Sequence, residues 1–539
     1  MNIDFRWNVR IPLRDGLALN ASVYTPRGQT AAAPSILALT PYTIDYHHDR
    51  GVYFAANGYP FVLADVRGRG NSDGSFHPFV HEARDAYDAV EWIAMQAFCN
   101  GKVAMWGGSY SGYIQWAAAK ERPLHLATIV PAAAPYLGID FPMRRNILQS
   151  FLVRWLMYTS GRASQTRIFA DDDFWSSLFK RWYRSGRALC ELDELVGSPS
   201  PIFQEWLKHP EPDAYWDALN PSDHQYSQLR IPTLTITGIY DDDQPGALEH
   251  YKRCSRNCSP GSGRHFLVIG PWDHSGTRTP QKQVGGLPLG SASEVDLPKL
   301  HLEWYSWTMG TGAKPKFLHK LVAVYVTGAE YWRYADTLDE LTAGWRPLFL
   351  DSAQNANSVW ASGWLSDRIG SGVPDSYQFD PCDACGSEGD AEARVSGGSV
   401  TDQTLVLALT GRQLVYQSAP FEGDEEVVGF FRLSAWISID CPDTDLYASV
   451  YELSPDGVTI RLSTDAIRAR YRLDPRVSSP VAIGEALRYE FDQFTFLSRE
   501  IKRGSRLRLV ISPIGHLIDC TISFHWTHPV SRDRTHLVS

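Results

Sequence analysis

The sequence predicts an α/β protein with a mostly parallel sheet, a helical insertion and a separate β-rich domain. Three observations support this class. Short apolar runs flank a helical pattern in the first 140 residues, the strand signals stop at about 141 and return after 225, and alternating strands alone follow 340. We therefore predict four segments. The core comprises residues 1–140 and 226–340, a helical cap lies between them at 141–225, and a C-terminal β-sandwich of jelly-roll type follows at 341–539.

The first part of the core combines strand and helix patterns. Residues 8–27 alternate apolar and polar side chains around Asp15-Gly16, which predicts a β-hairpin. Residues 81–96 carry apolar side chains at helical spacing. Apolar runs bounded by Gly, Pro or Asp, as expected of buried parallel strands, occur at 35–39, 60–64 and 103–106. Strand, helix and strand in this order imply right-handed crossovers in one sheet.

The later segments differ in pattern. Residues 148–157 and 173–182 have the spacing of amphipathic helices, and such an insertion commonly covers a site as a cap. Strand patterns return at 233–237 and 265–269, where the core resumes. In the C-terminal part, alternating strands separated by turn residues are predicted at 400–409, 429–437, 446–453, 487–496 and 505–511.

Composition excludes some classes of function. The 539 residues carry a net charge of −10 without a basic stripe, which argues against a nucleic-acid partner. No window approaches the roughly 18 apolar residues that span a bilayer, so no membrane association is expected. The polar N-terminus, Met1 to Arg6, has no apolar signal core, and we expect a cytoplasmic protein.

The eight cysteines include two close pairs, Cys254/Cys258 and Cys382/Cys385. Two such pairs could supply four thiolates to a zinc ion. The pairs are far apart in the sequence and lack nearby histidines, so we favour reduced thiols and predict no metal site.

The strongest chemical signal is Gly107-Gly-Ser-Tyr-Ser-Gly112. It follows a predicted strand and precedes a predicted helix, the setting in which a nucleophilic serine sits on a strained turn. Ser109 is therefore the candidate nucleophile. The usual pattern is G-x-S-x-G, and here Ser111 stands at the final position with Gly112 one residue later. A glycine-rich turn without chemistry is the alternative.

A nucleophilic serine needs a base and a group that orients the base. The predicted strand at 233–237 leads to Asp241, and the strand at 265–269 leads to His274. In α/β-hydrolases the chain order is Ser, Asp or Glu, then His, with the last two on loops after strands. The sequence thus predicts an α/β-hydrolase core with Ser109 as nucleophile, His274 as general base and Asp241 as orienting acid.

With these residues the chain resembles the cocaine-esterase-like serine hydrolases. That group includes X-Pro dipeptidyl-peptidase-like (S15) enzymes, glutaryl-cephalosporin acylases and α-amino acid ester hydrolases. The resemblance covers the whole chain but weakens after 370, with departures at 381–386 and 512–517. The segments that carry it are Pro41-Tyr42, 65–74, 107–112, 209–216, 238–241 and 270–274.

The resemblance implies roles for further residues. Ser109, Asp241 and His274 map onto the family's triad. Tyr42 maps onto the side-chain donor of the oxyanion hole, with the backbone N–H of Tyr110 as its partner. Removing one such donor typically costs about 10²–10³ in rate. The 65–74 segment is expected to be structural, with an Arg–Asp network that braces the site. No cofactor is implied, and because family members often self-associate, a homodimer is expected.

Substrate-binding candidates rest on weaker signals. Asp242, Asp243 and Gln244 follow the predicted catalytic acid. By resemblance to the α-amino acid ester hydrolases, Asp243 would hold a substrate ammonium group, whereas Gln244 replaces an acid. A solvated acidic loop, or an aspartate that caps the next helix, is the alternative. Aromatic side chains of the cap that could line an acyl pocket, or only pack the helices, are Trp155, Tyr158 and Trp175.

Several functions share this chemistry. A Ser–His–Asp site cleaves esters, amides and thioesters alike, so the leading hypothesis is a hydrolase of small-molecule acyl esters or amides that favours acyl groups with a free α-amine. An X-Pro or aminoacyl peptidase and an acyltransferase are alternatives of the same fold. A non-catalytic binding protein with a degenerate site is the alternative from another class.

Overall fold

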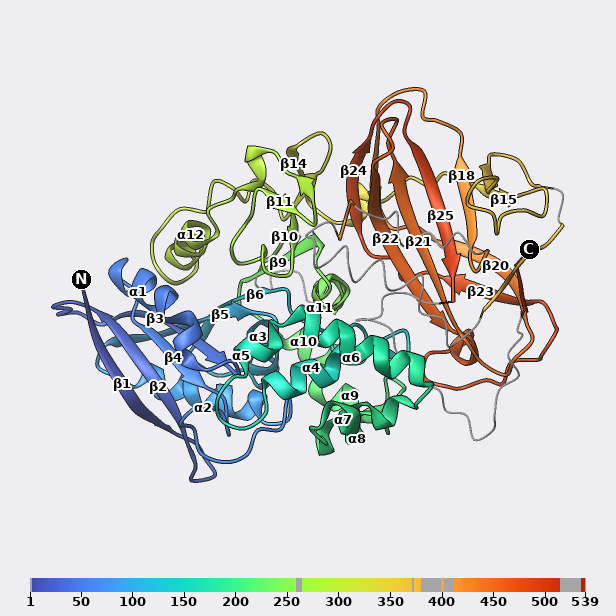
Figure 1. Cartoon of the computed structure of the whole chain (residues 1–539). Helices are drawn as coiled ribbons and strands as arrows, with labels where there is room; N and C mark the ends of the chain where they lie inside the picture. The colour runs from blue at the N-terminus through green and yellow to red at the C-terminus, as the bar shows by residue number, and fades with distance from the viewer. Residues whose placement is uncertain are drawn as a thin grey trace.

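The computed structural model describes residues 2–257, 264–370, 373–379, 399–401, 411–513 and 535–538. A ten-stranded sheet forms the core, in the order β1-β2-β4-β3-β5-β6-β9-β10-β13-β14 (Figure 1). The strands from β4 to β13 pair in parallel, and the pairs at both edges are antiparallel. Their bounds are β1 Ile3–Pro12, β2 Ala18–Pro26, β3 Ala33–Thr40, β4 Phe61–Asp65, β5 Cys99–Gly108, β6 Leu126–Ala132, β9 Thr233–Tyr240, β10 His265–Asp273, β13 Val322–Val326 and β14 Tyr331–Ala335.

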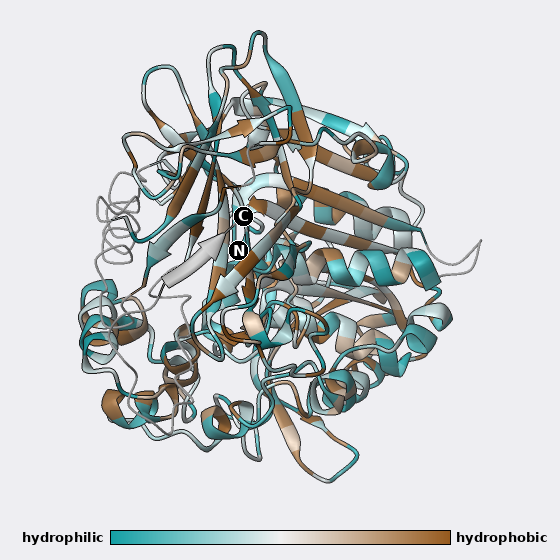
Figure 2. Ribbon diagram, turned by 90° about the vertical axis from the view of Figure 1, so that its right-hand side faces the viewer, coloured by the Kyte–Doolittle hydropathy of each residue, from teal (hydrophilic) through white to brown (hydrophobic). Residues whose placement is uncertain are grey.

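Helices cover both faces of this sheet. One face packs against α1 (His48–Ala56) and α12 (Leu297–Met309) around a cluster that includes Trp106. The other face packs against α2 (Glu82–Ala94), α3 (Tyr110–Glu121) and α11 (Gln244–Asn257). Figure 2 shows hydrophobic residues concentrated on the strands and hydrophilic residues on the outer turns of the helices. The predicted α/β core is confirmed, and the strand and helix patterns of its first part match these elements.

The insertion between β6 and β9 is helical, as predicted. A short hairpin precedes the helices, formed by β7 (Met143–Arg144) and β8 (Ile147–Leu148). The predicted cut at 225 falls inside the last helix of the insertion, because Ser222 caps that helix and its side chain accepts a hydrogen bond from the Gln225 N–H. The helices are α4 Phe151–Tyr158, α5 Thr166–Phe169, α6 Asp172–Ser185, α7 Leu192–Val196, α8 Pro201–Trp206, α9 Ala214–Leu219 and α10 Asp223–Gln228.

The C-terminal part is a β-sandwich with its own hydrophobic core. A six-stranded sheet runs β15 (Phe349–Asp351), β16 (Gly363–Ser366), β18 (Leu414–Ser418), β25 (Arg506–Ser512), β21 (Asp445–Leu453) and β22 (Thr459–Arg468). A four-stranded sheet runs β17 (Asp375–Gln378), β26 (Thr535–Val538), β20 (Leu433–Ile439) and β23 (Leu487–Phe491). A small pair joins β19 (Glu425–Gly429) to β24 (Leu497–Ile501). Another small pair, β11 (Gln283–Val284) with β12 (Leu287–Pro288), lies between β10 and α12 in the second part of the core.

Two of the strands predicted for this domain differ from the elements that the structure shows or fall largely outside the described residues. The strand predicted over 429–437 is divided between β19 and β20, because the backbone of Gly429 turns at φ 133°. Most of the strand predicted over 400–409 lies outside the described residues. Within the described ranges, no helix is long and apolar enough to cross a membrane.

Candidate active site

Ser109 occupies a strained turn between β5 and α3. Its backbone has φ 60° and ψ −128°, a region that residues with a Cβ rarely adopt. The neighbours must be small: a Cβ on Gly107 would lie 2.5 Å from Ser111 Cβ, and one on Gly112 would lie 2.6 Å from the Ala132 carbonyl oxygen. The turn leaves the Ser109 side chain partly exposed at the carboxyl end of the sheet, where a substrate can reach it.

Ser111 explains the departure from the usual elbow pattern. Its hydroxyl donates a 2.6 Å hydrogen bond to the carbonyl oxygen of Leu39 on β3, and its side chain is buried. A serine therefore fits where the pattern has a glycine, because its polar group finds a backbone acceptor. The close approach to β6 is instead made by Gly112.

The structure brings His274 and Asp241 together as the sequence predicts. Asp241 follows β9 directly, His274 follows β10, and the Nδ1 atom of His274 lies 2.8 Å from Asp241 Oδ1. The other carboxylate oxygen accepts from the Thr237 hydroxyl at 2.9 Å. Because an ionised carboxylate only accepts, Nδ1 carries the proton and Nε2 is left as the acceptor that a general base needs.

The pKa of His274 is raised above its ordinary value. Burial acts to lower it, but the hydrogen bond to Asp241 and the charges of Asp241 and Asp243 outweigh burial. No hydrogen bond joins His274 to Ser109 within the described part of the chain. Such catalytic hydrogen bonds are often long in unliganded enzymes and shorten when substrate binds.

Tyr42 lies beside the nucleophile, on the loop after β3. Its phenol oxygen accepts a 3.2 Å hydrogen bond from Trp155 Nε1, and its ring stacks on Tyr158 with centroids 5.3 Å apart. Burial raises the pKa of Tyr42 to about 12, while hydrogen bonds with the side chains of Trp155 and Ser109 act in the opposite direction. The hydroxyl therefore keeps its proton at neutral pH and can donate to an oxyanion.

Tyr110 is the first residue of α3, so its backbone N–H lies at the helix N-terminus, where N–H groups lack intrahelical partners. Its side chain points into the core, where the hydroxyl donates to the Glu82 carboxylate and accepts from the Phe79 N–H at 2.8 Å. Burial and the neighbouring Glu82 raise the pKa of Tyr110 well above its usual range. The side chain is thus anchored, and the backbone N–H stays beside Ser109.

Asp243 joins the His274–Asp241 pair as a second carboxylate. Its Oδ2 atom lies 3.7 Å from His274 Nδ1, and its backbone N–H donates to Asp241 Oδ1 at 3.1 Å. Burial raises the pKa of Asp243 well above its ordinary value, and the charges of Asp140 and Asp241 add to the rise while His274 opposes it. Its side chain remains 16% exposed, so a ligand in the site can touch it.

The predicted aromatic residues of the cap divide into two groups. Trp155 and Tyr158 both contact Tyr42 and therefore border the site. Trp175 is wrong as a pocket residue: it is fully buried, its indole N–H donates to the Ile168 carbonyl, and its rings pack on Phe174 and Phe179. It fills the interior of the cap, because α6 presents it to the neighbouring helices.

The described residues contain no cluster of His, Cys, Asp and Glu that could hold a metal ion. Cys99 and Cys190 are free thiols. Of the two close cysteine pairs, Cys258, Cys382 and Cys385 lie outside the described residues.

Comparison with protein families gives two matches. One model, described as X-Pro dipeptidyl-peptidase (S15 family), matches residues 15–276, a span that includes Ser109, Asp241 and His274. A second, described as the X-Pro dipeptidyl-peptidase C-terminal non-catalytic domain, matches residues 369–537. The chain belongs to this S15 family of serine hydrolases. The match includes the C-terminal β-sandwich as well as the catalytic core.

Individual relatives are consistent with membership of the S15 family. Cocaine esterase of Rhodococcus sp. (strain MB1 Bresler) is 26% identical over 489 residues, covering 86% of this chain and 83% of the esterase. An α-amino acid ester hydrolase superposes with a TM-score of 0.82 at 20% identity, covering 100% of this chain and 94% of that one. An aminopeptidase from a marine sediment Thaumarchaeota archaeon gives 0.83 at 21% identity with the same coverage. At these identities the two structures show a shared fold.

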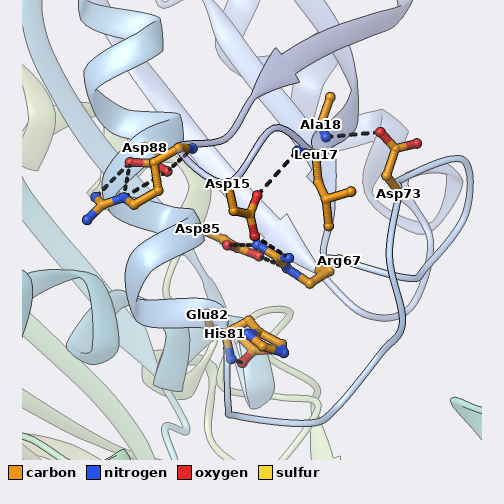
Figure 3. A network of polar contacts seen from close by, with 10 residues as sticks. Asp15, Leu17, Ala18, Arg67, Asp73, His81, Glu82, Asp85 and Asp88 are labelled. Atoms are coloured by element: carbon orange, nitrogen blue, oxygen red, sulfur yellow. Dashed lines mark hydrogen bonds and ion pairs between the residues drawn. The ribbon is translucent and has the colours of Figure 1, made fainter.

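The segment that follows β4 braces the S15 site, as the sequence predicts. Arg67 bridges the hairpin turn to α2, since its guanidinium donates to Asp15 at 2.6 Å and to Asp85 at 2.7 and 2.9 Å (Figure 3). Arg69 is fully buried and donates to the carbonyl oxygens of Pro41 at 2.7 Å and Thr159 at 2.6 Å. Arg69 therefore connects the loop that carries Tyr42 to the end of α4 in the cap.

Gln244 has a role that the sequence does not reveal. It is fully buried at the start of α11, directly after the acidic run. Its amide nitrogen donates to the carbonyl oxygens of Gly238 and Phe496, both at 3.0 Å, and its amide oxygen accepts from the Phe496 N–H at 2.7 Å. It thus joins the loop of Asp241 to the C-terminal domain. The sequence shows only an amide directly after an acidic run, which does not indicate this contact.

Proposed function

We propose that this chain hydrolyses esters or amides of small acyl substrates through an acyl-enzyme on Ser109, and that the acyl group carries a free α-amine. The observation that carries the proposal is the position of Asp243. Its carboxylate lies beside the base His274, is partly exposed, and is near enough to Tyr42 for its charge to act on the phenol. A cation on the acyl group would find its counter-charge there.

The geometry supports a two-step reaction. Ser109 Oγ attacks the substrate carbonyl carbon while His274 Nε2 takes the hydroxyl proton, and the carbonyl oxygen becomes an oxyanion held by Tyr42 Oη–H and the Tyr110 N–H. The bond to the leaving group then breaks, and His274 returns the proton to the departing oxygen or nitrogen. Water attacks the acyl-enzyme in the second step, with the same base, and releases the acid and the free serine.

Asp243 is suited to recognising an ammonium group. Its raised pKa means that the buried carboxyl holds its proton more tightly than a solvated one. A cation bound beside it stabilises the ionised form, so ligand binding and loss of this proton are coupled. An acyl group without the amine gains no such interaction and leaves the carboxyl desolvated.

The curated relative named cocaine esterase supports the ester half of the proposal, since it is an esterase by name and similar over most of both chains. The α-amino acid ester hydrolase and the aminopeptidase have substrates with free amines by name, but their likeness shows the fold alone. The proposal that the acyl group carries a free α-amine therefore rests on Asp243.

The test compares alanyl and propionyl 4-nitrophenyl esters, which differ in the α-amine. In Asp243→Asn we expect kcat/KM for the alanyl ester to fall about 10- to 100-fold more than for the propionyl ester, the range of one charge-assisted hydrogen bond. Asp242→Asn is the matched control, because Asp242 is an exposed neighbour. Equal losses on both esters in Asp243→Asn would refute recognition of the amine.

A further inference from the structure

A narrow cavity lies on the side of the nucleophile away from the cap. Its enclosed space is about 10 Å³, room for one water molecule, and two arginines, Arg50 on α1 and Arg278 after β10, line it. The other lining residues are Trp106, Gly107, Ala132, Pro298 and His301. Trp106 and Ala132 belong to the sheet face that α1 and α12 cover, whereas Trp155 and Tyr110 belong to the cluster on the opposite face.

The two guanidinium groups make few bonds with the protein. Arg50 uses one nitrogen, Nη2, for the Arg278 carbonyl oxygen at 3.2 Å and the Thr279 hydroxyl at 2.9 Å. Arg278 donates through Nη1 to the adjacent Thr277 at 3.3 Å. No described carboxylate forms an ion pair with either arginine. Each guanidinium has five N–H donors, so most of them have no hydrogen-bond partner in the described protein.

The surroundings add no negative charge within contact distance. Burial and the two arginines lower the pKa of His47 to about 3, and burial lowers that of His301 to about 4, so both rings stay neutral. Burial, followed by the charge of Arg278, lowers the pKa of Arg50. The charges of Asp49 and Asp296 oppose this shift, but neither carboxylate forms an ion pair with Arg50, and an anion bound between the two arginines would stabilise both.

The cavity adjoins the catalytic serine. A Cβ added to Gly108, the residue before Ser109, would lie 2.5 Å from Arg278 Nη1. Arg278 follows His274 by one short turn, and Arg50 follows the loop that carries Tyr42. If the acyl half of a substrate contacts Tyr158 and Asp243 on one side of the sheet, this cavity is the space beside the nucleophile that is left for the leaving half.

We propose that Arg50 and Arg278 form a subsite for a carboxylate carried by the leaving group. The planar, paired donors of a guanidinium match a carboxylate, and the water-sized space beside the two arginines would take one carboxylate oxygen. This inference rests on the proposed function, because it takes Ser109 as the nucleophile. The substrate class becomes an aminoacyl ester or amide whose alcohol or amine bears a carboxylate, of which a free dipeptide is the simplest.

Four phenyl esters separate the two halves of the substrate. Alanyl and propionyl groups are each joined to 4-hydroxybenzoate and to 4-hydroxybenzamide, and every kcat/KM is divided by the ester's rate of alkaline hydrolysis. For the wild type we expect the carboxylate ester to exceed the carboxamide ester by about 10- to 100-fold. The preference should shrink as salt is added.

Variants then assign the preference to the arginines. Arg50→Gln and Arg278→Gln should bring the carboxylate-to-carboxamide ratio close to one, and Arg278→Lys should restore part of it as a point charge. Arg27→Gln is the matched control: Arg27 is a surface arginine with its side chain 61% exposed. Calorimetry of 4-hydroxybenzoate against 4-hydroxybenzamide on Ser109→Ala gives the same comparison without turnover.

The outcomes are distinct. A wild-type ratio near one together with equal binding of the two phenols would overturn the subsite. A lost preference for alanyl over propionyl, with the carboxylate preference intact, would refute the amine half of the proposed function and leave the subsite standing. If inorganic phosphate inhibits all four esters equally and Arg278→Gln abolishes that inhibition, the cavity holds a free anion and the substrate assignment is wrong.

Discussion

Tyr42→Phe removes one hydroxyl from the site and tests the oxyanion hole directly. In the structure this hydroxyl already accepts from Trp155 Nε1 at 3.2 Å, so its own proton is directed to another acceptor, and Ser109 is its neighbour. The pKa of about 12 keeps that proton in place throughout the working range of an esterase. The ring itself stays stacked on Tyr158 in the variant.

The magnitude follows from losing one of two donors. We expect kcat to fall about 10²–10³-fold, which is roughly 3–4 kcal/mol of transition-state stabilisation. KM should change little, because the oxyanion exists only after attack. The Trp155 N–H loses its acceptor, and leaving a buried donor unpaired costs about 1–3 kcal/mol of stability. The variant should therefore melt earlier yet remain folded.

The assay is steady-state hydrolysis of an alanyl 4-nitrophenyl ester, run well below the melting temperature of the variant. Tyr158→Phe is the matched control, since it removes a phenol hydroxyl from the ring that stacks on Tyr42. We expect that control to stay within about fivefold of the wild type, because the oxyanion hole keeps both of its donors. If Tyr42→Phe retains kcat within threefold, or changes KM alone, Tyr42 is no oxyanion donor.

Three further predictions concern the charges around the site. Asp241→Asn should lower kcat about 10⁴-fold without unfolding the protein, since His274 loses the acceptor that fixes its tautomer; a loss below tenfold would contradict this. The acid limb of kcat/KM should have its midpoint above 6.5, because the raised pKa of His274 keeps the base protonated to higher pH, and Asp243→Asn should move that midpoint down. Burial raises the pKa of Glu82 to about 7 from 4.5, so its favourable contribution to stability is complete below pH 4.5 and is lost as pH rises through 7. From pH 5 to pH 8, the free energy of unfolding measured with urea should therefore rise by roughly 2.5 kcal/mol in Glu82→Gln relative to the wild type. A difference between the two proteins that does not change with pH would refute this.

Much of the fold and of the arrangement of the candidate site could be predicted because the signals are local. Asp241 and His274 each follow a buried strand directly, and parallel strands bring their carboxyl ends to one edge of a sheet. The elbow at Ser109 is likewise a contiguous strand, turn and helix. Such features depend on neighbours in the sequence, so periodicity and order are enough to find them.

Other features depend on contacts between distant residues. Gln244 meets Phe496 across 252 positions of the chain, and Arg50 meets Arg278 across 228. The residues around Gln244, Phe496, Arg50 and Arg278 in the sequence give no sign of these contacts. The prediction that Trp175 lines the pocket was wrong for a related reason. Helical spacing identifies the buried face of a helix but not which elements cover it. In the sequence Ser111 departs from the G-x-S-x-G pattern, and only the structure shows that its hydroxyl bonds to the Leu39 carbonyl oxygen.

The central claim is that Ser109 is an activated nucleophile, and covalent labelling tests it most directly. The wild type and Ser109→Ala are treated with a fluorophosphonate, and the intact masses are measured. We expect one adduct on the wild type, mapped to Ser109 by peptide analysis, and none on the variant. Absence of an adduct on the wild type, or an equal adduct on both proteins, would mean that Ser109, His274 and Asp241 do not act as a triad.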